Sequence, residues 1–312
     1  MSVSSFYERY GLVVILFVLC AFFTLMNENF ISFYNIQNIF KQSCINGLIA
    51  FGMTFVILLG AIDLSVGSVL ALVGFICASL LVNYQLPFWL VAPIAILLGA
   101  LLGAINGFLV ARLKLQAFIA TLVTMSIYRG ITLILSQGLP LRNISQVSEE
   151  MKYINRGDIL GIPISMLIYL AIFALLWLIL HKSLFGKYVY ATGGNEEAAR
   201  LSAIPTSRVK FISYAICGSL SALAAILYVS RYNSIYPNAG FGFELDAIAA
   251  VVIGGTSMSG GKGLIFGTLI GALIIGILNN GLNLLGISSF YQELIKGLVI
   301  LLAVIADRKK SQ

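Results

Sequence analysis

The sequence predicts an all-α protein that crosses a membrane many times. Hydrophobic residues make up 60% of the 312 residues and charged residues only 10%, whereas soluble domains average about 45–50% apolar and about 25% charged residues. The mean hydropathy is +1.00, and the apolar residues gather in stretches of roughly 20, the length of a helix that crosses ~30 Å of hydrocarbon. We therefore expect a single membrane domain over residues 1–312.

Ten apolar stretches are candidate membrane spans. The third is interrupted at its start by Asp63, and the eighth is unusually short. Broken or undersized spans are typical of transporters, in which the backbone lines a cavity. The predicted spans are residues 11–26, 43–60, 64–82, 88–110, 115–135, 161–181, 211–230, 244–256, 263–284 and 290–306.

Lysine and arginine residues predict the orientation of the chain. With both termini in the cytoplasm, the inner loops and tails hold twelve of them and the outer loops hold five. Cytoplasmic loops of membrane proteins carry such an excess. The net charge of +7 therefore reflects topology and the anionic inner leaflet of the lipid bilayer, and no nucleic-acid partner is expected. Four of the inner residues lie near the chain ends: Arg9, Arg308, Lys309 and Lys310.

A weak internal repeat divides the chain into two similar halves. Asp63-Leu64 and the small, apolar residues after it match Glu244-Leu245 and the residues that follow. Asn106-Gly107 is echoed by Asn280-Gly281. Five spans separate the matching features, so the halves would have opposite orientations, as inverted repeats do. The alternative is that glycine-rich apolar helices resemble each other by composition alone.

Glycines recur at four-residue spacing in two of the predicted spans. This spacing lets helix backbones approach each other closely. We expect that approach within one subunit, and contact between two subunits is the alternative. The glycines are Gly99, Gly103 and Gly107 in the fourth span, and Gly267 and Gly271 in the ninth.

Four carboxylates, Asp63, Glu244, Asp246 and Glu293, lie in or beside predicted spans. A carboxylate at the bilayer centre costs about 2.5–3.5 kcal/mol on insertion scales, so an interior or functional position is expected for each. Glu293 and Lys296 are three residues apart on a predicted helix and are expected to pair.

Asp63 and Ser65 stand before an apolar run, which is the pattern of a helix start. Either side chain could cap the free N–H groups at the start of the third span. The alternative is a direct part in gating or in the path of a substrate, which we keep open for Asp63, Ser65, Glu244 and Asp246.

The most informative polar segment covers residues 187–210, and the charge count predicts that it lies in the cytoplasm. Asn195 is a favourable helix N-cap, followed in the first turn by Glu196 and Glu197. Arg200 follows at the spacing that allows helical ion pairs.

A second short helix is expected to start at Thr206 or Ser207, directly after Pro205. Two short amphipathic helices on the cytoplasmic face would suit docking to a soluble partner. A solvated loop is the alternative.

The segment GGTSMSGGKG, residues 254–263, is not a phosphate-binding loop. The pattern G-x-x-x-x-G-K-[ST] requires Gly at 256 and Ser or Thr at 263, where this chain has Thr256 and Gly263. The sequence contains no Ser/His/Asp grouping, no HExxH and no Cys/His cluster. It therefore predicts no catalytic residue, no metal site and no cofactor in this chain.

Several segments together resemble the membrane permease subunits of bacterial ABC importers for monosaccharides, over nearly the whole chain. The C-terminal segment SSFYQELIKGLVILLAVIADRKK is similar to the ribose branch of that family. The other matching segments are GMTFVILLGAIDLSVGSVLAL, QAFIATLVTM, YATGGNEEAARLSAIP, FELDAIAAVVIGGTSMSGGKG and GTLIGALIIGILNNGLNLLGIS.

The resemblance implies a multi-pass protein of the bacterial inner membrane that works with other polypeptides. The implied partners are a cytoplasmic ATPase subunit that carries ATP and Mg, an extracytoplasmic sugar-binding protein, and a second permease copy in a homodimer. The cytoplasmic loop would dock into the ATPase through Gly194, Asn195, Glu196, Glu197, Ala199, Arg200, Pro205 and Arg208.

One position in this loop departs from the family pattern. Members of the family commonly have Gly-Ile where this chain has Ala203-Ile204. The departure puts the turn before Pro205 in doubt.

The function that the resemblance implies is passage of a monosaccharide, D-ribose first, driven by ATP hydrolysis on the partner. Alternatives are the same importer type with another pentose, a hexose or an autoinducer-like sugar. A different class is an ion-coupled secondary transporter, with Asp63 and Glu244 as proton or sodium sites. A secondary transporter would take up its substrate without ATP. A membrane enzyme is a more distant alternative.

Overall fold

The computed structural model describes residues 3–311. The side chains of residues 3–10, 303 and 306–311 are outside the description, and with them Arg9, Arg308, Lys309 and Lys310 of the predicted inner charge excess.

The described chain is almost entirely helical, with four two-residue strands that form two small antiparallel pairs, β1 with β4 and β2 with β3. The elements are α1 (Val3–Met26), η1 (Glu28–Ile31), α2 (Phe33–Leu58), α3 (Val66–Val82), α4 (Phe88–Ala111), α5 (Ala117–Ser136), β1 (Leu141–Arg142), η2 (Ile144–Gln146), α6 (Glu149–Arg156), β2 (Asp158–Ile159), β3 (Ile162–Pro163), α7 (Ile164–Lys182), α8 (Leu184–Gly194), α9 (Glu196–Leu201), α10 (Thr206–Tyr232), β4 (Ser234–Ile235), α11 (Phe243–Ile253), α12 (Ile265–Leu284) and α13 (Ser289–Ser311).

A helix occupies each of the ten predicted spans, but not all of them qualify as spans by length and composition. Among the described residues, six helices are long and apolar enough to cross a membrane: α2, α4, α5, α7, α10 and α12. Gly11–Met26 in α1 and Val66–Val82 are apolar but shorter, and α11 has only 11 residues. The all-α membrane class is confirmed, whereas the number of ten spans and the inverted repeat remain predictions.

Loops predicted to share one side of the membrane lie together in the structure. At one end, the Tyr190 hydroxyl donates to the Gly263 carbonyl at 2.7 Å, and the Gly261 N–H donates to the Leu58 carbonyl at 2.9 Å. At the other end, β1 pairs with β4, and the Gln37 side chain donates to the Gly161 carbonyl at 3.1 Å. These four contacts join segments that the span order predicts on the same side.

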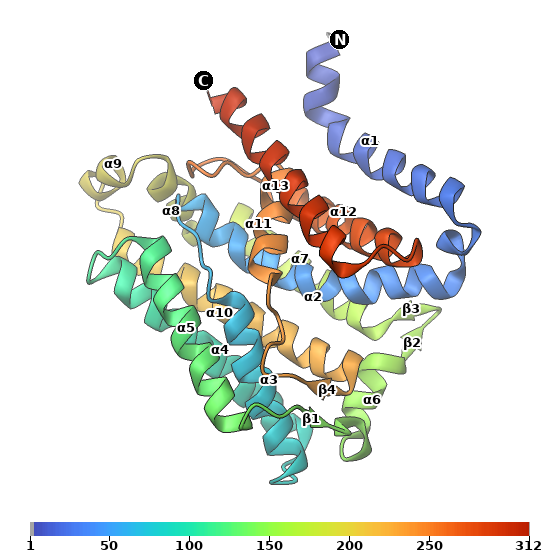
Figure 1. Ribbon diagram of the computed structural model, residues 1–312. Helices are drawn as coiled ribbons and strands as arrows, with labels where there is room; N and C mark the ends of the chain where they lie inside the picture. Colours follow the sequence, from blue (N-terminus) through green and yellow to red (C-terminus); the bar gives the residue numbers. More distant parts are fainter. Residues whose placement is uncertain (1–2, 312) are drawn as a thin grey trace.

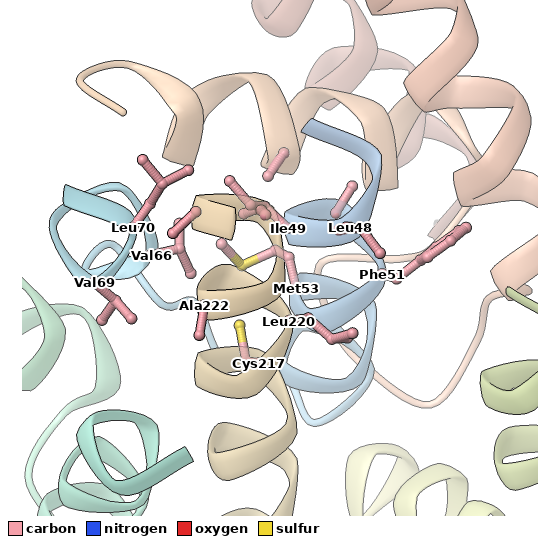
Figure 2. Packing of buried hydrophobic residues seen from close by; sticks show 14 of the residues in the cluster. Leu48, Ile49, Phe51, Met53, Val66, Val69, Leu70, Cys217, Leu220 and Ala222 are labelled. Carbon is pink, nitrogen blue, oxygen red and sulfur yellow. The ribbon is translucent and has the colours of Figure 1, made fainter. Parts of the chain in front are cut away.

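The second half of α2 is the centre of the core. Every residue from Ser43 to Leu58 is buried, and a helix that is apolar on all sides belongs in a protein interior. Figure 1 shows α2 in the middle of the molecule, with α1, α12 and α13 to one side and α3, α4 and α5 to the other. In Figure 2, Met53 of α2 points toward α10 and α3, whereas Phe51 points away from them, and the Phe51 ring stacks on Tyr169 of α7.

Small residues let pairs of helices approach within backbone contact. A Cβ added to Gly103 of α4 would collide with the Tyr214 carbonyl of α10, and one on Gly99 would reach the Gly218 carbonyl. The same holds for α12 and α11, where Gly271 faces the Ala250 carbonyl. The expectation that these glycines pack within one subunit is confirmed.

Two helices begin inside the bundle, and their starts meet. α3 follows an irregular segment of residues 59–65, and α11 follows another of residues 236–242. Gly240, with φ +71°, places its carbonyl against Gly67 at the start of α3, where a Cβ would collide with it. The predicted break before the third span and the short eighth span are both confirmed.

Candidate functional site

Asp63 is the centre of a closed polar cluster at the start of α3. It is 1% exposed, and its Oδ1 accepts from the Ser65 N–H at 2.9 Å and the Ser65 hydroxyl at 2.7 Å. The Asn106 amide of α4 donates to the same oxygen at 3.3 Å and to the Ser65 hydroxyl at 2.7 Å. Three donors thus surround one oxygen of the carboxylate.

The capping prediction for this cluster is right in position and wrong in detail. Ser65 is the N-cap residue of α3, but its side chain makes no capping hydrogen bond. Asp63 instead bonds to the backbone of Ser65, two residues on, and so stabilises the turn that leads into the helix.

The backbone beside Asp63 is held by two other helices. The Ile62 carbonyl accepts from the Thr121 hydroxyl of α5 and from the Tyr214 hydroxyl of α10, both at 3.4 Å. The turn is therefore connected to α4, α5 and α10. In the part of the chain that the structure describes, no lysine or arginine forms an ion pair with Asp63.

Asp246 is the centre of a second polar cluster, at the first turn of α11. Its Oδ2 accepts from Asn46 of α2 at 3.2 Å, from Asn279 of α12 at 3.3 Å, and from the Lys296 ammonium of α13 at 3.1 Å. Four helices converge on this one carboxylate. The expected pairing of Lys296 with Glu293 is wrong: Lys296 is directed to Asp246, and Glu293 is exposed.

A cavity of about 120 Å³ lies against this second cluster, and we call it the Asp246 cavity. Eight of its ten lining residues are polar, the exceptions being Ile45 and Phe243. Asn283 and Tyr232, at the ends of α12 and α10, are exposed and also line it. The cavity therefore reaches from the surface at those helix ends toward the middle of α2, where Asn46 lies.

Glu244 belongs to neither cluster. Its Oε1 accepts from the Gly242 N–H at 3.2 Å at the start of α11. The segment before α11 is held by Arg129 of α5, whose Nη1 donates to the carbonyls of Pro237 at 2.6 Å and Ala239 at 2.9 Å. The four residues predicted for gating lie in three places: Asp63 with Ser65, Glu244, and Asp246.

Sequence reasoning missed the partners of Asp246. Asn46, Asn279 and Lys296 come from three different helices, and their convergence depends on tertiary packing. Each is a polar residue inside an apolar stretch, which is the signal that could have identified it, because such residues are costly in a bilayer.

The predicted docking loop, residues 187–210, covers most of α8 and all of α9, and α9 begins as predicted. The Asn195 side chain accepts from the Ala198 N–H at 2.9 Å, so its role as N-cap is confirmed. Lys210 of α10 pairs with Glu196 at 2.6 Å, while Arg200 and Glu197 are 4.0 Å apart and mostly exposed. The predicted second helix does start at Thr206, but it is the 27-residue α10 and not a short helix.

The turn before Pro205 has the strain that the departure from the family pattern suggests. Ala203 has φ +62°, a left-handed conformation that favours glycine and costs other residues roughly 1–2 kcal/mol. The turn forms nevertheless, with the Ala203 and Ile204 N–H groups donating to the carbonyls of Arg200 and Ala199 at 3.1 and 3.0 Å.

The start of this loop packs closely against the rest of the protein, whereas most of its predicted docking residues are exposed to solvent. Gly193 sits so close to the Leu58 carbonyl at the end of α2 that a Cβ would collide with it, and Gly261 packs on Gly194. Of the eight predicted docking residues, Ala199 is buried and the other seven are exposed: Gly194, Asn195, Glu196, Glu197, Arg200, Pro205 and Arg208.

Comparisons with known proteins agree over almost the whole chain. The family described as "Branched-chain amino acid transport system / permease component" matches residues 35–304. The ribose import permease protein RbsC of Haemophilus influenzae is 52% identical over 94% of this chain and 91% of its own length. That of Bacillus subtilis is 50% identical over 97% and 94%, and the L-arabinose transport system permease protein AraH of Escherichia coli is 38% identical over 100% and 94%.

No solved structure matches the chain. The family match covers the described bundle from the start of α2 into α13. The chain therefore belongs to the permease family described as "Branched-chain amino acid transport system / permease component".

Proposed function

We propose that the chain is the membrane-spanning permease subunit of an ABC importer that moves D-ribose across the bacterial inner membrane. The cargo rests on relatives named ribose import permeases, at 48–52% identity over most of the chain. The observation that carries the importer mechanism is the cytoplasmic loop, whose docking residues are exposed while its base is fastened to α2 and α10.

In this proposal the permease is the passive part of the importer. ATP and Mg bind a separate ATPase subunit, which docks on residues 187–210 from the cytoplasm, where both chain termini also lie. An extracytoplasmic binding protein delivers the sugar to the opposite face, and a second permease copy completes a homodimer. The ten helices form two halves of opposite orientation. The two helix starts that meet at Gly67 and Gly240, one in each half, fit such an inverted repeat.

The importer mechanism is tested by uptake of labelled D-ribose into proteoliposomes that hold the permease with its ATPase and binding protein. We expect uptake to require all three components and ATP. Uptake of another sugar in place of ribose would change the cargo and leave the mechanism. Uptake driven by an ion gradient alone would overturn the proposal.

The docking surface is tested by the double variant Glu197→Ala with Arg200→Ala. The two side chains are mostly exposed, and at 4.0 Å their own pair adds little stability. We therefore expect the variant to fold normally but to co-purify with much less ATPase. The control is Glu149→Ala with Lys152→Ala, an exposed pair of the same spacing on α6 at the other end of the molecule. Equal loss of ATPase in both double variants would contradict the docking surface.

A further inference from the structure

We propose that the Asp246 cavity is a transit site for the cargo and binds it as a neutral polyhydroxyl compound, a monosaccharide. The inference rests on the proposed function, because it names where the cargo contacts the membrane part of the importer. It adds a binding site within one permease chain, formed by α2, α11, α12 and α13.

The lining of the cavity has the chemistry of sugar recognition. Amide and ammonium donors stand beside carboxylate and amide acceptors in Asn46, Asp246, Asn279 and Lys296. A sugar hydroxyl both donates and accepts, so a mixed lining can bond to it in either sense. Phe243 adds an aromatic wall at the start of α11.

One buried acceptor in the cavity has no protein partner. The Oδ1 atom of Asn279 is buried and receives no hydrogen bond from any described residue, while the Nδ2 atom of the same amide donates to Asp246. Leaving a buried acceptor unpaired costs about 1–3 kcal/mol. In the cavity a water molecule or a ligand hydroxyl can donate to this oxygen and remove that cost, and a bound sugar would do so in place of the water.

The charges in the cavity favour a neutral ligand over an ion. The Asp246 carboxylate already has the Lys296 ammonium at 3.1 Å, and the two charges cancel. A sodium ion would meet the ammonium, and an anion would meet the carboxylate. A branched-chain amino acid would need an apolar surface for its side chain, and Ile45 and Phe243 are the only apolar residues among the ten that line the cavity.

The position and size of the cavity suit passage better than tight binding. Its exposed rim, at Tyr232 and Asn283, lies at the end of the molecule opposite the cytoplasmic loop, and its floor at Asn46 lies halfway along α2. The cavity, with a volume of about 120 Å³, has room for several water molecules and is open at its rim. It admits one edge of a sugar ring, which agrees with the weak binding that rapid passage requires.

The test is ligand protection of a cysteine placed in the cavity. Gln42, half-buried in the lining, is replaced in Gln42→Cys, and Cys20, the half-buried native cysteine, is removed in Cys20→Ser. The complex with its ATPase and binding protein is reconstituted in vesicles and treated with a charged thiol reagent. D-ribose at ~100 mM, which saturates a site with a Kd of about 1 mM, is expected to slow labelling at least about threefold. L-leucine at the same concentration is expected to leave it unchanged.

A matched control and a second variant make the result specific. Tyr84→Cys, exposed beyond the end of α3 and outside the cavity lining, should be labelled equally with and without ribose. Adding Asn279→Leu to Gln42→Cys should raise the ribose concentration for half protection roughly two- to tenfold, the effect of one lost hydrogen bond. Without sugar, the labelling rate of Gln42→Cys should be the same with and without Asn279→Leu. If the role of Asn279 were only structural, the added substitution would change that rate as well.

The outcomes separate this inference from the proposed function. Labelling that ribose does not slow, or that leucine slows equally, overturns the transit site, even in vesicles that take up ribose with ATP. Protection by ribose in vesicles without ATP-driven uptake supports the site and overturns the importer mechanism.

Discussion

Asp63 and Asp246 are both carboxylates at the starts of broken helices, and the structure surrounds them in opposite ways. Asp63 is closed in by Ser65 and Asn106, with no described cation beside it. Asp246 has Lys296 as its counter-ion and faces the Asp246 cavity. The difference indicates that one carboxylate fixes a turn and that the other lines a cavity, although both stand at the start of an apolar run in the sequence.

The largest effect is expected at the closed cluster. Asp63→Ala removes the acceptor of the Ser65 N–H and the Ser65 hydroxyl and leaves both buried donors unpaired, whereas the Asn106 amide keeps its bond to the Ser65 oxygen. Each unpaired buried group costs about 1–3 kcal/mol, so we expect a loss of roughly 3 kcal/mol or more. Size-exclusion chromatography and thermal melting of the detergent-solubilised protein measure it. Asp63→Asn, which keeps an acceptor, should lose less, and a wild-type melting curve for Asp63→Ala would contradict the assignment.

A smaller loss of stability is expected when the Lys296–Asp246 ion pair is broken. We call the cluster around Asp246 the open cluster, because it borders the Asp246 cavity. Lys296→Met leaves Asp246 without its counter-ion, which costs 3–5 kcal/mol for a fully buried pair. Because the Lys296 side chain is 25% exposed, we expect about 1–2 kcal/mol in melting experiments. Lys296→Met combined with Asp246→Asn should recover most of it. If the double variant is as unstable as the sum of the single variants, the pair is not coupled as described.

Asn106 and Asn279, whose amides donate to Asp63 and Asp246, allow a direct comparison of the two clusters. The expected losses of stability are smaller than for the carboxylates. Asn106→Ala opens a hole in a closed cluster, and we expect it to destabilise the protein by about 1–2 kcal/mol. Asn279→Ala should cost less than about 1 kcal/mol, because water from the Asp246 cavity can replace the amide. Thermal melting of the two variants in one detergent decides the order, and the reverse order would remove the distinction between closed and open clusters.

The smallest effect is expected from collapsing ion gradients. Asp63 is closed in by hydrogen bonds, and Asp246 already has an ammonium group, so neither offers a vacant place to a sodium ion. ATP-driven ribose uptake in vesicles should therefore be unchanged by ionophores that dissipate proton and sodium gradients. A large loss of uptake would instead support ion coupling.

Sequence reasoning was most accurate where a signal is local. The N-cap at Asn195, the break before α3 and the short α11 each depend on a few neighbouring residues, and the structure has all three. The length of α10 was missed because the helix runs unbroken from the polar loop into a predicted span. Composition alone was enough for the membrane class, but the number of spans was not settled by it.

The partners of the intramembrane charges were not predictable in this way. Lys296 has Glu293 at helical spacing, and its choice of Asp246, 50 residues away, depends on how α13 packs against α11. Asn46 and Asp246 are 200 residues apart. A single sequence gives the residues that need a partner in the bilayer, and only the packing of the helices gives the partner.

The backbone contact between Gly67 and Gly240 has a mechanical consequence. Neither glycine has a side chain to fit into the opposite backbone segment, and the nearest side-chain atom at Gly67 belongs to Glu244. Two surfaces without interlocking side chains can slide or separate without any change of rotamer, whereas packed side chains must leave one arrangement for another. The start of α3 and the segment that leads into α11 thus meet at a backbone contact that no interlocking pair of their own side chains holds in one register, as a joint between two moving parts requires.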